Sequence, residues 1–345
     1  MSFPTSLQDY YATNYTRCSE LFSIFSTSEF LSFGAKSQFF VLVPINLFGF
    51  YCILFKTPKY MSEFQFHLCH LQFWFTVLTI FYTILTTPYH FFPASVRCSV
   101  GLFRDMNISS TYQLLLINIV TGGIVSAVIL LFENRHKHLV PPTDIFYKIN
   151  GVHRLILGIF NFLLGSLGAW TIFLQDGNQE LVKMEYLKLV PCPTKLYFDE
   201  CSVAIPSAKN IWALGVGPAG CLIPIQVIFF ISHSLMYLRK IQNINTFSKR
   251  TKKLQKSFFR AGIAQVTSPI LVIVVPLFLL TYILITKQYL PGAMNICILC
   301  IPSHSALSTG SLILFNVPYR DFVRHKFKIT ANSVQRNSRV AIVSS

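Results

Sequence analysis

The sequence predicts an all-α integral membrane protein: a seven-transmembrane helix bundle with its N-terminus outside. Of the 345 residues, 52% are hydrophobic and only 12% are charged, about half the roughly 25% usual in soluble domains. In addition, seven stretches of 19 to 33 residues contain no Asp, Glu, Lys or Arg. So few charges could not cover the surface of a soluble protein of this size. The composition therefore excludes an ordinary cytosolic enzyme and a disordered chain.

Each charge-free stretch is long enough to cross a bilayer as a helix. A spanning helix needs roughly 20 apolar residues for the roughly 30 Å hydrocarbon core, and it satisfies its own backbone there. A β-barrel would instead show alternating segments of about ten residues, whereas a run such as 270–280 is continuously apolar. The seven helices are expected near 38–55, 67–90, 108–132, 153–174, 211–237, 262–286 and 292–316.

Segments at both ends of the chain complete the predicted organisation. Residues 1–37 are expected to form an extracellular tail, and residues 38–316 the bundle. In 317–329, aromatic and aliphatic residues interleave with basic ones, which is typical of a short amphipathic helix at a membrane interface. Residues 330–345 are polar and contain serine, so we expect a disordered cytoplasmic tail.

The net charge of +16 is divided unequally between the two sides of the membrane. Segments on the side of the N-terminus hold nine Lys and Arg and nine Asp and Glu, whereas the other side holds 20 and four. Because basic residues are retained in the cytoplasm, this asymmetry places the N-terminus outside. The charge therefore records membrane orientation and does not indicate a nucleic-acid partner.

Four cysteines and one glycosylation sequence lie in the predicted outer segments. The cysteines are Cys18, Cys98, Cys192 and Cys201. An even set on the oxidising side suits a disulfide framework, although free thiols are the alternative and three connectivities are possible. A bridge from Cys98 to either of the later two would tether the long outer loop over the bundle. Asn14 begins an Asn-Tyr-Thr glycosylation sequence in the outer tail.

Motifs that resemble catalytic or cofactor sites have simpler explanations. Residues 215–220 match G-x-G-x-x-G, but a dinucleotide site requires a preceding strand, and here the match lies inside the fifth span. Small residues there favour close helix packing. His67 and His70 lie near the inner end of the second span, and two ligands do not complete a metal site. The sequence therefore predicts no enzyme activity, cofactor or metal.

Polar residues and prolines interrupt the apolar spans. The polar residues are Asn118, Gln226, Asn295, Ser303 and His304. Such groups usually face the bundle interior, where a hydrogen bond between helices contributes about 0.6 kcal/mol on average. Pro269 and Pro276 should kink the sixth helix. Because this helix follows the most basic cytoplasmic loop, we expect it to be the moving element.

An ordered set of motifs lies at the predicted cytoplasmic face. The motifs are Lys-Thr-Pro-Lys-Tyr-Met at 56–61, Phe-Glu-Asn-Arg at 132–135, Leu-Gln-Lys at 254–256, then Gln265, Pro269 and Pro276, and Pro-Tyr-Arg at 318–320. Together they resemble the nematode serpentine receptors of class H, in the Str superfamily of chemoreceptors. The similarity covers about 1–329, and sister classes share parts of the set.

The resemblance implies a G-protein-coupled receptor fold and a role in chemosensation, including olfaction. It implies a small extracellular ligand and a heterotrimeric G protein as partners, and it implies the plasma membrane, with the sensory cilium of chemosensory neurons as a location. By analogy, Glu133, Asn134 and Arg135 occupy the place of the acidic-Arg motif of rhodopsin-like receptors. They depart from that motif because Asn separates the acid from the Arg and no Tyr follows.

The expected G-protein surface combines this motif with basic residues. The third cytoplasmic loop holds eight Lys and Arg between 239 and 260 and no acid. Attraction to anionic lipid is its simplest role, at about 1 kcal/mol per basic residue, and G-protein docking would be additional. The remaining expected coupling residues are Lys252, Lys253, Lys256, Tyr319 and Arg320.

The expected ligand pocket lies in the outer halves of the helices. Its candidate residues are Tyr112, Gln113, Trp212, Thr281, Tyr282 and Asn295. No Asp or Glu in these outer halves could serve as counter-ion to an amine, which favours a neutral or apolar ligand. The alternatives to a receptor are a ligand-gated channel or transporter, or a degenerate, non-signalling member. A channel or transporter would need polar pore faces or repeats, and the sequence displays neither.

Overall fold

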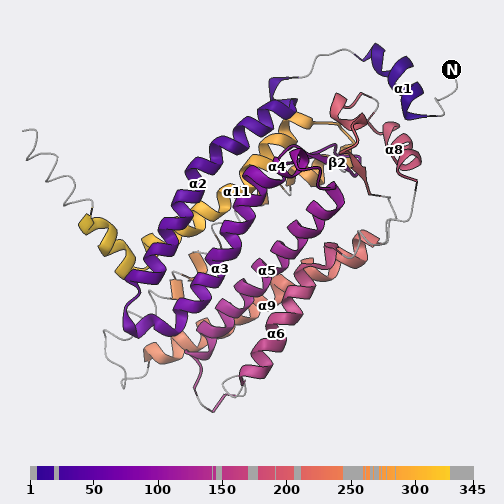
Figure 1. The fold of residues 1–345 in the computed structure, drawn as a ribbon. Helices are drawn as coiled ribbons and strands as arrows, with labels where there is room; N and C mark the ends of the chain where they lie inside the picture. The colour runs from indigo at the N-terminus through magenta and orange to yellow at the C-terminus, as the bar shows by residue number, and fades with distance from the viewer. Residues whose placement is uncertain are drawn as a thin grey trace, which may run out of the picture.

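The computed structural model describes most of the chain as one elongated bundle of helices with a small cap at one end (Figure 1). The described residues are 6–18, 23–141, 143–144, 150–169, 178–190, 192–205, 211–243, 259–260, 262–264, 267, 272, 274–276, 278–283 and 285–326. Within them, five helical segments are long and apolar enough to cross a membrane. They are α2 (Ser28–Lys56), α3 (Ser62–Ile80) with its π-helical continuation η4 (Phe81–Leu85), α5 (Ser110–Lys137), α9 (Ile211–Asn243) and α11 (Pro291–Phe315).

Two further segments correspond to the expected fourth and sixth helices. The shorter apolar helix α6 (Gly151–Gly165) lies in the fourth position. In the sixth, the described residues between 259 and 286 are all helical, and Pro276 is buried. Pro269 and Gln265 lie outside the described residues.

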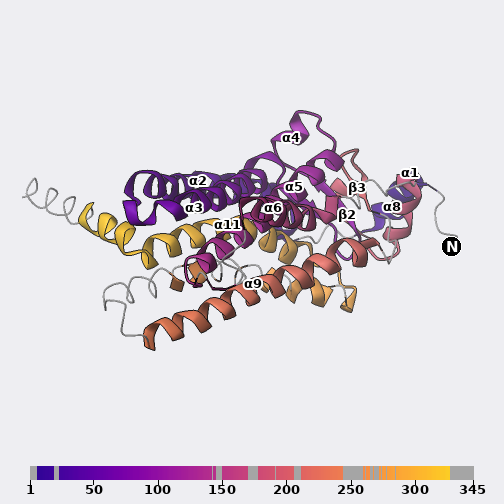
Figure 2. The same ribbon diagram turned by 90° about the horizontal axis from the view of Figure 1, so that it is seen from below.

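The long helices lie side by side (Figures 1 and 2). Helix α5 packs against α3, α6 and α9, and α11 packs against α2 and α3. Large apolar side chains such as Phe33, Phe40 and Phe66 remain more than 70% exposed. A helix that is apolar on all sides is typical of a membrane span, so these exposed faces are suited to lipid.

Helix α2 begins ten residues before the expected start at residue 38. The Thr27 hydroxyl accepts a hydrogen bond from the Phe30 backbone N–H at 3.2 Å and caps the first turn. Glu29 and Lys36 therefore lie within the helix. A charge-free stretch marks the part of a helix that lipid can cover, whereas a cap marks where the helix itself begins.

The outer end of the bundle, named after the predicted orientation, carries a three-stranded antiparallel sheet. Its strands β1 (Pro88–His90), β2 (Val96–Ser99) and β3 (Val203–Ala204) lie in the order β1-β2-β3. Tyr89 pairs with Cys98, and Arg97 pairs with Val203. The sheet brings the turn after η4 next to the segment before α9.

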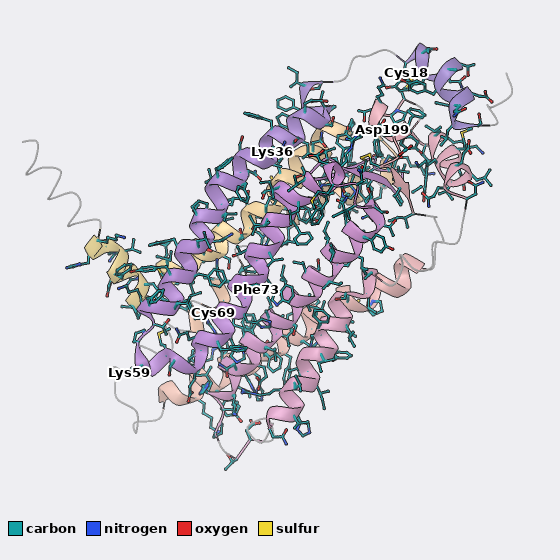
Figure 3. The ribbon with its side chains drawn as sticks, viewed as in Figure 1. Cys18, Lys36, Lys59, Cys69, Phe73 and Asp199 are labelled. Atoms are coloured by element: carbon teal, nitrogen blue, oxygen red, sulfur yellow. A yellow bond between two sulfur atoms is a disulfide. The ribbon has the colours of Figure 1, made fainter. Side chains whose placement is uncertain are left out.

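Short helices surround this sheet and complete the cap. They are α1 (Leu7–Thr13), η1 (Tyr15–Arg17), η2 (Ile24–Ser26), α4 (Leu102–Asp105), α8 (Gln179–Leu187) and η6 (Lys195–Phe198), while η3 (Lys59–Met61) lies at the opposite end. Buried aromatic residues of the cap, including Tyr89, Phe91 and Tyr197, form one cluster with residues of α11. Figure 3 places Cys18 and Asp199 at the outer end and Lys59 at the opposite end, which is named the cytoplasmic end after the predicted orientation.

Two disulfides hold the cap together. Cys18 is bonded to Cys192, and Cys98 is bonded to Cys201. The first joins the N-terminal tail to the loop before α9, and the second joins that loop to β2. These are the four cysteines that the sequence placed outside, and the structure selects one of the three connectivities.

A polar network lies in the middle of the bundle and connects α2, α3 and α11. Asn46 donates to the Ser305 hydroxyl at 2.9 Å, and Gln72 donates to the Thr309 hydroxyl at 2.9 Å. Gly49 allows this close approach, because a Cβ there would lie 2.7 Å from the Thr309 methyl carbon. Asn46 and Gln72 both lie in charge-free stretches, but their roles were not predicted from the sequence.

The polar residues named from the sequence have separate roles. Gln226 of α9 and Asn161 of α6 form two reciprocal amide hydrogen bonds of 3.0 Å. Asn118 donates within its own helix to the Leu114 carbonyl at 2.9 Å. His304 is buried with its ring against Phe75, and Ser303 is half-buried.

Candidate functional site

A cavity of about 160 Å³ opens at the outer end between the cap and the bundle. Strands β1 and β2 and the turn between them supply most of its lining, and α5, the short helix after Ser166 and the residue after β3 (Val203–Ala204) supply the remainder. The lining residues are His90, Phe92, Ala94, Ser95, Val96, Arg97, Leu114, Asn118, Gly168 and Ile205. Most of this surface is apolar, with a few polar groups, as in small-molecule sites generally.

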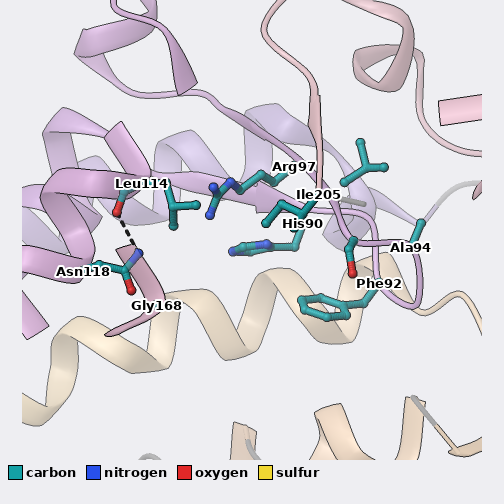
Figure 4. Close-up of a pocket in the computed structure, with 10 residues that line it drawn as sticks. His90, Phe92, Ala94, Arg97, Leu114, Asn118, Gly168 and Ile205 are labelled. Atoms are coloured by element: carbon teal, nitrogen blue, oxygen red, sulfur yellow. Dashed lines mark hydrogen bonds between the residues drawn. The ribbon is translucent and has the colours of Figure 1, made fainter. Parts of the chain in front are cut away.

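Arg97 is the charged residue among those lining the cavity. Its Nη2 is buried and has no hydrogen-bond partner among the described residues. Burial lowers the pKa of the guanidinium to about 10, so the side chain is still a cation at neutral pH. Figure 4 shows the side chains of Arg97 and His90 extending in the same direction, toward Leu114 and Asn118.

His90 lies beside Arg97 and is uncharged at neutral pH. Burial, followed by the positive charge of Arg97, lowers the pKa of the imidazole to about 3. The polar residues of the described lining are therefore one cation, a neutral imidazole, the amide of Asn118 and Ser95. Gly168 allows Asn118 to approach, because a Cβ there would lie 2.4 Å from the Asn118 Oδ1.

Of the six residues expected to form the ligand pocket, the five whose side chains are described are not among those lining this cavity. Tyr112 and Tyr282 are 65% and 49% exposed, and Thr281 is also exposed. Gln113 is buried and donates to the Ile108 carbonyl at 2.7 Å. Trp212 lies in the first turn of α9, and its side chain is outside the described part.

Asn295, the last of these six residues, has a structural partner. Its side-chain amide donates to the backbone carbonyls of Phe25 and Thr27 at 2.9 and 3.2 Å. It thereby ties the outer end of α11 to the chain leading into α2. Asn14, the predicted glycosylation site, is exposed at the end of α1.

At the cytoplasmic end, the carboxylate of Glu133 pairs with Arg154 of α6. The distance between Glu133 Oε1 and Arg154 Nε is 2.9 Å, and the Glu133 side chain is only 2% exposed. Asn134 adds a weaker contact, since its Oδ1 lies 3.4 Å from Arg154 Nη2. The acid of the Glu-Asn-Arg motif thus fastens α5 to α6.

Arg135 points instead toward the sixth segment and the helix that follows α11. It is almost fully buried, and a Cβ built on Gly262 would lie 1.6 Å from its Nη1. It also lies close enough to Tyr319 for an electrostatic interaction. The Tyr319 hydroxyl is in turn 2.7 Å from the Thr57 hydroxyl, at the end of α2. Arg135 therefore occupies a junction of four segments.

The rest of the expected coupling surface is only partly described. Lys252, Lys253 and Lys256 lie outside the described residues. Arg320 is half-buried in a helix over 317–326, and its Nε is 3.8 Å from Asp321 Oδ1. Beside the junction, His136 Nε2 and His233 Nδ1 are 2.6 Å apart, which joins α5 to α9.

These features define a class of protein: a multi-pass membrane bundle with a disulfide-bonded outer cap, an outer cavity and a buried polar junction at the opposite end. The family model for the serpentine type 7TM GPCR chemoreceptor Srh matches residues 26–329. The chain is also similar to serpentine receptor class H-72 of Caenorhabditis elegans, with 26% identity over 334 residues, which are 95% of each chain. The protein thus belongs to the Srh family of seven-transmembrane serpentine chemoreceptors.

Several residues of both sites were not found from the sequence. Arg97 and Arg154 entered only as charges on the outer and cytoplasmic sides, and Gly262 was one residue of an apolar stretch. An available signal was the position of Arg97 next to Cys98, because a disulfide fixes neighbouring residues against the bundle. The pairing of Glu133 with Arg154 depends on how the helices pack, and the sequence contains no comparable signal for it.

Proposed function

We propose that this protein is a chemosensory receptor that binds a small extracellular molecule at its outer cavity and signals to a heterotrimeric G protein. Its membership of the chemoreceptor family supports this assignment. On the basis of the same family membership, the proposed location is the plasma membrane, including the sensory cilium of chemosensory neurons. The cavity supports the proposal as a place for the ligand, and the charge asymmetry of the sequence supports a basic cytoplasmic surface for the partner.

The arrangement around Arg135 is the observation that carries this proposal. Gly262 leaves space for the guanidinium between α5 and the sixth segment. Outward movement of the sixth segment would remove that contact and uncover the cytoplasmic end of the bundle. A ligand that favours the open arrangement would shift the population toward it. Glu133 is held by Arg154, so this switch does not require release of Arg135 from its neighbouring acid.

A ligand screen in cells with a G-protein readout tests the proposal. We expect at least one small molecule to activate the wild-type receptor, and Arg135→Ala at equal surface level to abolish or strongly reduce that response. Gly310→Ala is a matched control, since a Cβ at Gly310 meets no atom within 4 Å. Ligand-dependent currents or uptake that persist in cells lacking G proteins would instead favour a channel or transporter.

A further inference from the structure

The outer cavity contains a cation whose charge is not balanced by an acid in the described structure. Arg97 forms no ion pair with any described residue, and its Nη2 is enclosed without a hydrogen-bond partner. By contrast, Arg104 of the same outer end lies 3.0 Å from Asp199 on the surface. Enclosing part of a charged group without a partner is unfavourable, so an occupant of opposite charge would be stabilised.

The geometry restricts the size of that occupant. A cavity of about 160 Å³ is close to the roughly 150 Å³ space that holds one benzene molecule in an engineered protein core. Phe92, Val96 and Leu114 supply apolar surface around the charged group. A ligand matching this lining has one small anionic group and a compact apolar body.

Carboxylate is the anionic group that suits these surroundings best. The guanidinium presents two parallel N–H donors that match the two oxygens of a carboxylate. His90 and Asn118 add polar groups to the same cavity without a second positive charge, which a dianion such as phosphate would favour. The neutral imidazole of His90 follows from its pKa of about 3.

We propose that the outer cavity binds a small monocarboxylate, with the carboxylate on Arg97 and the apolar body against Phe92 and Leu114. This inference rests on the proposed function for its biological meaning, but the binding itself does not depend on signalling. It replaces the neutral or apolar ligand that the sequence favoured, because that expectation considered only the absence of outer acids and not the position of Arg97.

Binding to the purified full-length receptor in detergent tests the proposal directly. The probes are butyrate, hexanoate and benzoate, each compared with its neutral amide at the same millimolar concentration and with sodium chloride as the ionic-strength control. A ligand that binds only the folded state raises the midpoint of thermal unfolding. We expect at least one acid to raise this midpoint and its amide to have a much smaller effect.

Substitution of the arginine provides the second arm. Arg97→Gln should weaken binding of the active acid at least roughly tenfold, whereas Arg97→Lys should retain part of it, since lysine keeps the charge but not the paired donors. Arg104→Gln is the matched control on the same face and should bind like the wild type. If Arg97→Gln does not fold, the comparison of acid with amide on the wild type decides alone.

The outcomes separate this inference from the proposed function. Equal effects of acids and amides, or no effect of any of the three acids, would overturn the carboxylate site. Activation of the G protein by a neutral molecule with Arg97→Gln unaffected would overturn it as well, while leaving the receptor function intact. Acid binding that depends on Arg97, but without any G-protein response to that acid, would retain the site and count against the proposed function.

Discussion

The two ends of this receptor are held together by different kinds of interaction. At the outer end, two disulfides fix a small sheet above the bundle. At the cytoplasmic end, the ion pair of Glu133 with Arg154 and the packed side chain of Arg135 join the described helices. The other cysteines of the described chain, in α2, α3, α9 and α11, are free. Covalent bonds maintain one shape, whereas polar contacts can exchange partners. The difference suits a fixed binding cavity at one end and a movable junction at the other.

Removal of a cap disulfide should have the largest effect on stability. We expect Cys98→Ser to destabilise the receptor by about 2–5 kcal/mol and to reduce its surface level, because the bond to Cys201 positions β2 and the cavity wall. Surface labelling and thermal unfolding in detergent would measure both. Cys221→Ser is the control, since Cys221 is unpaired and exposed on α9. Equal surface levels for the two variants would contradict a structural role for the bond.

Breaking the ion pair at the opposite end should have the next largest effect. Glu133→Gln leaves Arg154 without its carboxylate, which costs about 2–4 kcal/mol for a largely buried pair. The double variant Glu133→Gln with Arg154→Gln should recover part of the loss in a double-mutant cycle. Thermal unfolding of the purified variants provides the free energies.

The exposed pair at the outer end is the matched comparison for this cycle. Arg104 and Asp199 are separated by 3.0 Å, but their side chains are 39% and 41% exposed. Substituting either residue should therefore cost less than about 1 kcal/mol. If this pair coupled as strongly as Glu133 with Arg154, burial would not explain the difference between the two ends.

Acid pH should weaken the cap by a smaller amount through His90. Burial lowers the pKa of this imidazole to about 3 in the folded protein, compared with about 6.5 in an unfolded chain. The stabilisation is present above pH 6.5 and decreases as the pH falls toward 3, because only the unfolded state takes up the proton. At pH 5 the loss is at most about 2 kcal/mol.

The measurement for this prediction is the midpoint of thermal unfolding at pH 7 and pH 5. We expect His90→Gln to remove part of the pH dependence, while His153→Gln, at the exposed start of α6, should leave it unchanged. An unchanged pH dependence in His90→Gln would show that other groups control the acid response.

The helical fold could be predicted from the sequence because lipid imposes a simple rule. Long charge-free stretches such as 106–132 have few ways to satisfy their backbone other than a helix, and the structure has α5 there. The ends of the helices were harder to predict from the sequence, since Thr27 caps α2 outside its charge-free stretch. The set of cysteines at one end of the bundle followed from charge and redox chemistry, although the connectivity required the folded cap. The orientation in the membrane stays a prediction from charge.

The sites were harder to predict because they depend on contacts between distant segments. Glu133 and Arg135 stood out as a local motif, but Arg154 and Gly262 become their neighbours only after the helices pack. Arg97 belongs to a loop that folds back over the bundle, and sequence spacing does not reveal which loop does so. Asn46 and Gln72 could have been noticed as polar residues within spans, yet their shared network also depends on packing.

Basal signalling of Gly262→Ala tests most directly whether the junction around Arg135 controls the receptor. An added Cβ would lie 1.6 Å from Arg135 Nη1, so the guanidinium must move while the rest of the bundle can remain in place. At equal surface level, we expect basal G-protein activation above that of the wild type, with Gly310→Ala at the wild-type level. Basal and ligand-induced activation of Gly262→Ala identical to the wild type would contradict the account.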